Sequence, residues 1–244
     1  MKKIIVILTV LIFVVSCLGC VGATWLVVRG GGPVVTEERA VSDFTGVNLM
    51  TSGNLYIEQG EQESLRIEAE QNVLPYLAAE VSGHTLEIKN RPNVLTFHTQ
   101  PVNFYLTVKK LDTIILSGSG DIKAPLLLGE QTTIKVSGSG DVDLGKLEAN
   151  RVEVVISGSG KVAIGGGQVE QQQVVISGSG NYQAPTLTSA TADVHVSGSG
   201  SAALRAREQL AVNVSGSGDV RYAGRPTIKQ HITGSGSIEP MTGS

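Results

Sequence analysis

Cysteine is nearly absent from this chain of 244 residues: the two cysteines, Cys17 and Cys20, both lie in an apolar N-terminal run. The remaining sequence therefore has neither a disulfide framework nor a cysteine-based metal site. Aromatic residues make up only 4%, which suits a narrow aliphatic core better than a compact globular one. The net charge is −3, and acids and bases are interspersed without a basic face, so we do not expect nucleic acid as a partner.

What the chain has instead is a recurring tetrapeptide, Ser-Gly-Ser-Gly. Copies begin at Ser117, Ser137, Ser157, Ser177, Ser197 and Ser215, and a variant copy begins at Thr233. The first five copies are evenly spaced, and the last two intervals are each shorter by two residues. No segment of helical length lies between the copies. A period of about 20 residues predicts an all-β fold, with each repeat forming one coil of a parallel β-helix, or β-solenoid.

The residues around each tetrapeptide alternate between apolar and variable positions. In the repeat at Ser157 this pattern directs Ile156 and Val162 into the tube, while Val155 and Lys161 point outward. Similar tetrapeptides also occur in flexible linkers, but linkers are not bracketed by strands in register. We therefore interpret Ser-Gly-Ser-Gly as a tight corner where two strands meet and successive coils approach closely.

The N-terminal segment, residues 1–28, has features of a signal peptide or membrane anchor. Lys2 and Lys3 precede an uncharged run, Ile4–Val28, which exceeds the length of about 20 residues that a helix needs to cross a bilayer. The sequence Val14-Val15-Ser16-Cys17 is similar to a bacterial lipobox, which makes Cys17 the candidate lipid-attachment residue. A transmembrane anchor helix and a lipoprotein both stay open, and a cleaved, secreted form is a third possibility. Either kind of anchor places the main domain outside the cytoplasm.

Between this segment and the repeats lie a spacer and a less regular β-rich region. Residues 29–39 contain three consecutive glycines and predict a flexible spacer. Residues 40–112 alternate at period two and are expected to form irregular coils that cap the solenoid formed by residues 113–244. Within them, Thr51–Leu55 is similar to a degenerate corner, and Asn72–Val81 is the only plausible short helix.

An ordered set of motifs carries a family resemblance over roughly residues 40–240. They are Asp43-Phe44-Thr45-Gly46-Val47, Asn72-Val73-Leu74, Leu86-Glu87-Ile88, and Leu111-Asp112 leading into Ser117-Gly118-Ser119-Gly120-Asp121. This combination resembles the "putative auto-transporter adhesin, head GIN domain" family of bacterial envelope proteins. The resemblance implies a right-handed parallel β-helix, an export or lipoprotein signal, and an adhesin-like role. It implies no catalytic residues.

Few side chains suggest chemistry of their own. Asp121 and Asp141 follow successive corners and, with Asp143 nearby, could hold a weak cation, although a solvated polar column is the favoured interpretation. Arg205, Arg207 and Glu208 form the only dense charge group in the repeats. The four histidines, His84, His98, His195 and His231, lack metal-ligand spacing.

The sequence therefore predicts a protein without catalytic activity or cofactor. We expect it to be membrane-tethered, to face the periplasm or the cell exterior, and to have a structural or binding role. A cell-surface glycan or an envelope protein is the expected partner. The alternative is a carbohydrate-active or carbohydrate-binding β-helix, which would require clustered carboxylates on one face.

Overall fold

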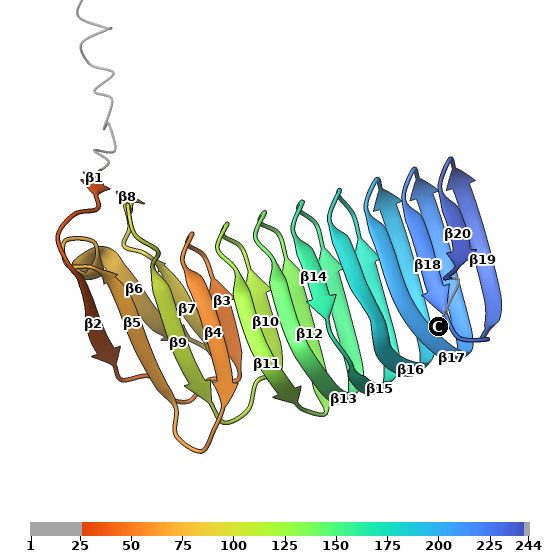
Figure 1. The fold of residues 1–244 in the computed structure, drawn as a ribbon, viewed down its shortest axis with the longest axis horizontal. Coiled ribbons are helices and arrows are strands. Elements are labelled where there is room, and N and C mark those ends of the chain that lie inside the picture. Colours follow the sequence, from red (N-terminus) through yellow and green to blue (C-terminus); the bar gives the residue numbers. More distant parts are fainter. Residues whose placement is uncertain (1–25, 242–244) are drawn as a thin grey trace, which may run out of the picture.

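The computed structural model describes residues 26–241, which form a β-solenoid (Figure 1). One single-turn 3₁₀ helix, η1 (Leu74–Tyr76), accompanies twenty strands in this part of the chain. Eighteen strands belong to one continuous sheet, and β1 (Leu26–Arg29) and β8 (Val94–Phe97) form a separate two-stranded ribbon. The all-β fold and the solenoid predicted from the repeat are confirmed.

Two rows of parallel strands build the repeat region, one before and one after the corners. Its strands are β10 (Thr113–Leu116), β11 (Ile122–Leu128), β12 (Gln131–Val136), β13 (Val142–Ile156), β14 (Lys161–Ile164), β15 (Gly167–Ile176), β16 (Asn181–Gly198), β17 (Ser201–Gly216), β18 (Asp219–Ala223), β19 (Thr227–Gly234) and β20 (Ser237–Pro240). Ile114 pairs with Ile134, one full period further on, and Val214 pairs with Ile232, one of the shorter periods further on. The sequence period is thus the coil length.

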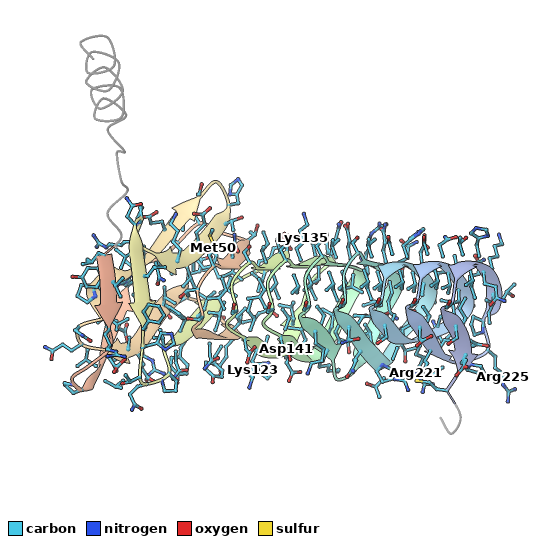
Figure 2. The ribbon with its side chains drawn as sticks, turned by 90° about the horizontal axis from the view of Figure 1, so that it is seen from above. Met50, Lys123, Lys135, Asp141, Arg221 and Arg225 are labelled. Carbon is cyan, nitrogen blue, oxygen red and sulfur yellow. The ribbon has the colours of Figure 1, made fainter. Side chains whose placement is uncertain are left out.

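Aliphatic columns fill the tube, as the alternating pattern predicts. Ile156 and Val162 are each 0% exposed, whereas Val155 and Lys161 are partly exposed. Figure 2 shows Lys135 pointing away from one face of the tube and Lys123 and Arg221 from the opposite face. The stacked Val, Ile and Leu columns remove apolar surface from water at every coil, at about 25 cal/mol per Å² buried.

The glycines of the corners are required by close backbone approach. A Cβ on Gly138 would lie 1.8 Å from the Gly118 carbonyl oxygen, and one on Gly158 would lie 2.1 Å from that of Gly138. Neither glycine has a positive φ, whereas Gly198 in a later corner has a φ of 144°. Space between coils therefore selects glycine in the early corners, and backbone conformation adds to that requirement in the later ones.

The N-terminal region, which precedes the repeats, forms coils whose order in the stack differs from their order in the sequence. Its strands in the main sheet are β2 (Val34–Arg39), β3 (Gly46–Leu49), β4 (Asn54–Gln59), β5 (Ser64–Glu70), β6 (Leu77–Ser82), β7 (Thr85–Asn90) and β9 (Asn103–Val108). The coil of β3 and β4 pairs in parallel with β10 and β11 on one side and with β7 and β9 on the other. Gly53 lies beneath the first Ser-Gly corner, since a Cβ on Gly120 would be 1.8 Å from its oxygen, as expected for a degenerate corner.

Antiparallel strands then close the N-terminal end. Strand β5 pairs antiparallel with β9, β2 pairs antiparallel with β5, and β6 pairs antiparallel with β7. The parallel edge of the solenoid is thereby covered, which removes a template for unwanted strand pairing. We call residues 26–111 the cap.

Two local predictions are wrong, and the end of the expected anchor differs. Residues 34–39 of the expected flexible spacer form β2, because they pair antiparallel with residues 65–70 of β5. Asn72–Val81 forms η1 and β6 instead of a helix, because Leu77–Ser82 pairs with β7. Residues 26–28, the end of the expected segment 1–28, belong to β1; the remainder of that anchor lies outside the described residues.

Candidate functional site

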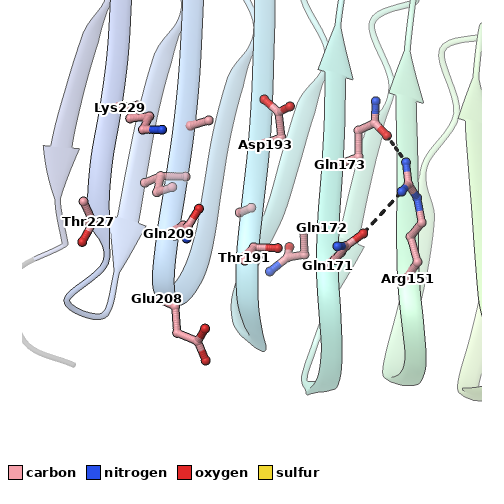
Figure 3. Close-up of a pocket in the computed structure, with 13 residues that line it drawn as sticks. Arg151, Gln171, Gln172, Gln173, Thr191, Asp193, Glu208, Gln209, Thr227 and Lys229 are labelled. Atoms are coloured by element: carbon pink, nitrogen blue, oxygen red, sulfur yellow. Dashed lines mark hydrogen bonds between the residues drawn. The ribbon is translucent and has the colours of Figure 1, made fainter.

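A polar groove crosses the strands that precede the corners in the second half of the solenoid (Figure 3). Its volume is about 600 Å³. Most lining side chains stand at the outward positions six and four residues before a corner, on β13, β15, β16, β17 and β19. These residues are Arg151, Gln171, Thr191, Gln209 and Thr227, and Gln173, Asp193, Ala211 and Lys229. The repeat thus aligns residues that lie one period apart in the sequence into a continuous surface.

Arg151 and two glutamines form one end of this groove. The Arg151 guanidinium donates hydrogen bonds to Oε1 of Gln171, at 3.3 Å, and to Oε1 of Gln173. These bonds fix the guanidinium beside the glutamine side chains, whose NH₂ groups stay available as donors. Arg151 makes no ion pair within residues 26–241, so this end of the groove offers a positive charge together with amide groups.

The other charges of the groove balance one another. Asp193 and Glu208 are acidic, and Arg151 and Lys229 are basic. Asp193 is half-exposed, and its Oδ1 lies 3.1 Å from Nε2 of His195. Among the described residues, 26–241, no aromatic side chain lines the groove. A polar, charge-balanced surface of this kind suits an extended ligand held by hydrogen bonds, and differs from the mostly apolar pockets that enclose small cofactors.

A buried polar network lies directly behind the groove. Gln172 and Ser189 are 2% and 0% exposed. The Tyr182 hydroxyl donates to Oε1 of Gln172 at 2.7 Å, and Nε2 of Gln172 donates to Oγ of Ser189 at 2.9 Å and to the Arg205 carbonyl at 3.1 Å. Burial raises the pKa of Tyr182, which stays neutral.

This network occupies the point where the coil becomes two residues shorter. Three residues of β16 between Ala184 and Thr188 have no partner in β17, and two residues of β17 then oppose one of β16. Beside this irregularity, Gln172 and Ser189 both donate hydrogen bonds to the Arg205 carbonyl. The polar core residues therefore hydrogen-bond a backbone group at the point where the strand register changes.

The aspartates that follow the corners are structural. Oδ1 of Asp121 accepts the backbone N–H of Asp141 at 2.9 Å, and Oδ1 of Asp141 accepts that of Lys161 at 2.9 Å. Lys161 also forms an ion pair with Asp141 at 3.2 Å. Within residues 26–241 no group of three or more His, Cys, Asp or Glu side chains could hold a metal ion. Each carboxylate instead ties its coil to the next.

The other candidates from the sequence are separated in the fold. His98 contacts Ser52 at 3.0 Å, and His231 contacts Thr233 at 3.3 Å. In the charged group at 205–208, Arg205 donates to the Pro185 carbonyl at 3.1 Å, whereas Glu208 lines the groove. Cys17 lies outside the described residues. Among residues 26–241 there is no helix with the length and apolar character needed to cross a membrane.

A second hollow, of about 250 Å³, lies on the cap beside Tyr56 and Tyr105. The two rings stack with centroids 5.2 Å apart, and the Arg66 guanidinium lies 4.1 Å from the centroid of the Tyr105 ring. Burial and the neighbouring Glu68 raise the pKa of Tyr105. Because Tyr56 and Arg66 both pack against the Tyr105 ring, this cluster forms a cross-strand ladder that stabilises the cap.

Fold and groove together define a capped parallel β-solenoid with a polar groove on its surface. The chain belongs to the family described as "putative auto-transporter adhesin, head GIN domain", whose model matches residues 43–226. The family resemblance drawn from the motifs is confirmed. No curated protein matches the chain.

Several solved structures share this fold. A putative adhesin from Bacteroides fragilis is 24% identical with a TM-score of 0.83, and the match covers 88% of this chain and 100% of that one. A putative adhesin from Parabacteroides distasonis is 25% identical with a TM-score of 0.65, over the same shares of both chains. A protein described as a putative lipid binding protein from the same organism is 23% identical with a TM-score of 0.73, again over 88% and 100%.

Sequence reasoning missed the groove. The run Gln171-Gln172-Gln173 was a signal that could have marked it, since Gln173 replaces the charged or small residues at the equivalent outward position of the other repeats and Gln172 places a long polar side chain in the inward column. The change of spacing after Ser197 was a second signal, because it indicates an irregularity beside these strands.

Proposed function

We propose that this chain is a non-enzymatic, adhesin-like β-solenoid, tethered to the membrane by residues 1–25 and facing the periplasm or the cell exterior, which binds an envelope protein through the groove. The observation that carries the proposal is the groove itself, with its glutamine amides, its balanced charges and its volume of about 600 Å³. Family membership supports the adhesin-like role.

Chemistry favours binding over catalysis in the groove. Glycoside hydrolysis needs a pair of carboxyl groups held at fixed separation, and an acid among them is normally buried so that it stays protonated. Asp193 is half-exposed and paired with His195. None of the described residues that line the groove is aromatic, so the groove offers no ring on which a sugar could stack. An extended protein segment, which needs donors and acceptors along its backbone, fits these residues better than a glycan does.

The tether rests on the sequence. Residues 4–25 carry no charge and follow Lys2 and Lys3. Either as a bilayer span, or through an acylated Cys17 that becomes the first residue after cleavage, this segment would hold β1 close to the membrane. Cell fractionation with protease shaving tests this part. Recovery of the full chain in the cytoplasm would refute it, and Cys17→Ala should release or mislocalise the protein only if lipidation provides the tether.

Binding is tested with matched charge reversals. Full-length protein is incubated with solubilised envelope proteins and, in parallel, with immobilised envelope glycans. Lys229→Glu, in the groove, should abolish retention of the bound protein, whereas Lys135→Glu, an exposed lysine of β12 outside the groove, should not. Equal retention by both variants would rule out the groove. If the protein is retained on glycans alone, and Lys229→Glu abolishes that retention, the partner is a carbohydrate and not a protein.

A further inference from the structure

The ribbon of β1 and β8 has an exposed apolar outer face. The two strands are parallel, with Val27 opposite Leu95 and Arg29 opposite Phe97. Paired residues share a face of the ribbon. Val27, Leu95 and Phe97 are 59%, 44% and 60% exposed, and Arg29 stands among them, while Val28 on the other face is 9% exposed.

This ribbon is held firmly although it lies outside the main sheet. The Gly30 N–H donates to the Phe97 carbonyl at 2.6 Å. Asn72 donates to the Arg29 carbonyl at 2.7 Å and accepts the Gly31 N–H at 2.9 Å. The first bond closes the ribbon, and the bonds of Asn72 join the end of β1 to the rest of the cap, so the outer face has a fixed direction.

A second clamp holds the chain that follows β8. The Glu70 carboxylate, 1% exposed at the end of β5, accepts the Thr99 hydroxyl at 2.5 Å and the Thr99 N–H at 2.9 Å. A Cβ on Gly30 would lie 1.9 Å from this carboxylate, so Glu70 packs directly under the exit of β1 as well. Exposed aliphatic and aromatic side chains that are held in one orientation indicate an interaction surface.

The segment that precedes the ribbon in the sequence indicates that the ribbon lies near a membrane. Leu26 follows the uncharged run Ile4–Trp25 without a spacer. If that run spans the bilayer, β1 begins where it leaves the membrane. If Cys17 is lipidated instead, the nine residue steps from Cys17 to Leu26 reach at most about 32 Å even when fully extended. Either anchor therefore keeps the ribbon within reach of the lipid surface.

The composition of the face fits that surface. Aliphatic and aromatic side chains partition into the boundary between headgroups and acyl chains, and an arginine beside them pairs with lipid phosphates. We propose that the outer face of the β1–β8 ribbon, formed by Val27, Leu95, Phe97 and Arg29, inserts shallowly into the membrane interface and orients the solenoid on it. This proposal rests on the proposed tether, because the ribbon alone is too small to hold the protein on a membrane.

The test places a fluorescent probe in the ribbon. Trp25 is the chain's one tryptophan, so Trp25→Phe gives a silent background. Into it we introduce either Phe97→Trp, in the ribbon, or Leu128→Trp, a matched control on β11 that is 49% exposed. Both full-length variants are reconstituted into vesicles of phosphatidylcholine and phosphatidylglycerol, with or without lipids brominated near the headgroup. Thermal unfolding checks that each variant is folded.

The proposal expects a shift of the Phe97→Trp emission to shorter wavelength and a loss of intensity with brominated lipid, with neither change for Leu128→Trp. Equal quenching of the two variants would overturn it. A shift in Phe97→Trp without quenching would also overturn it, because residues 1–25 or another protein surface would then cover the ribbon. Vesicle flotation separates the two proposals: protein that does not float refutes the tether, whereas protein that floats without quenching refutes only the ribbon contact.

Discussion

The cap and the repeat region both pair strands around one aliphatic core, but they arrange those strands in different ways. In the repeats, each strand pairs with the strand one period further on, and one set of inward positions serves every coil. In the cap, β3 and β4 lie between strands from two later parts of the chain, and antiparallel strands close the end. A periodic sequence can extend a sheet, but only a departure from the period can end it.

The largest expected effect tests the inward columns of the repeats. Ile156→Asp places a charge at a fully buried position, and we expect a loss of about 4 kcal/mol or more in the free energy of unfolding. Val155→Asp, at the adjacent outward position, should cost less than about 1 kcal/mol. Chemical denaturation of both variants checks this, and equal losses would contradict the register of the solenoid.

The glycines offer a direct contrast between the two regions. Gly138 has a neighbouring carbonyl 1.8 Å from its ideal Cβ. Gly83, in the cap hairpin, has a φ of 60°, and apart from its chain neighbours no atom of the described residues lies within 4 Å of its ideal Cβ. Gly138→Ala should cost about 1–3 kcal/mol through overpacking, and Gly83→Ala about 1–2 kcal/mol through backbone strain.

Asparagine distinguishes these two causes. Gly83→Asn should recover most of the stability lost in Gly83→Ala, because asparagine tolerates the left-handed region, while Gly138→Asn should be at least as harmful as Gly138→Ala. Melting temperatures of the four variants provide the measurement. Rescue by asparagine at Gly138 would mean that conformation, not space, selects glycine in the corners.

A smaller effect is expected where the repeat itself becomes irregular. Gln172→Leu keeps the approximate volume but deprives the Tyr182 hydroxyl and the Arg205 carbonyl of a partner, which should cost about 1–3 kcal/mol. Thr132 occupies the same inward column, and its hydroxyl has no hydrogen-bond partner within residues 26–241. Thr132→Val should therefore leave the free energy of unfolding unchanged or increase it, as chemical denaturation would measure. A similar loss of stability in both variants would contradict a stabilising role for the hydrogen-bond network of Gln172.

The smallest effect concerns the clamp in the cap. Hydrogen bonds from Thr99 lower the pKa of Glu70 below its ordinary value of 4.5. The ionised clamp therefore stabilises the fold fully above pH 4.5 and is lost as the pH falls through the lowered value. Limited proteolysis near residues 98–102 should increase at that lower pH, and Glu70→Gln should show the increase already at neutral pH. Unchanged cleavage in Glu70→Gln would contradict the clamp.

Much of the fold could be predicted from the sequence because the repeat defines its own register. The position of Ile156 relative to Ser157 recurs in every coil, so one alternation pattern determines the core of the entire repeat region. The degenerate corner at Thr51–Leu55 was recognisable for the same reason. The helix expected at Asn72–Val81 was wrong because β7 offers Leu77–Ser82 a strand partner, and tertiary pairing outweighs local preference.

The candidate groove could not be predicted in the same way. Its residues come from five strands and converge only after the coils are stacked. Apart from the glutamine run at 171–173, the outward positions carry no periodic constraint, so Asp193 and Lys229 are indistinguishable in sequence from solvent-exposed residues. The placement of β3 between β7 and β10 was equally hidden, since nothing in the local sequence of residues 46–49 indicates which later strands flank it.

Because the interfaces between coils are nearly identical, the length of the solenoid increases by a constant amount with each repeat. Each repeat adds one strand spacing, about 4.8 Å, along the axis. The groove begins at Arg151, in the strand before the third corner, so its height above the cap is set by the number of preceding repeats. Deleting residues 121–140, one period, would shorten this height by one spacing while keeping the cap and the groove. Chain length in this fold therefore sets how far the candidate groove lies from the ribbon.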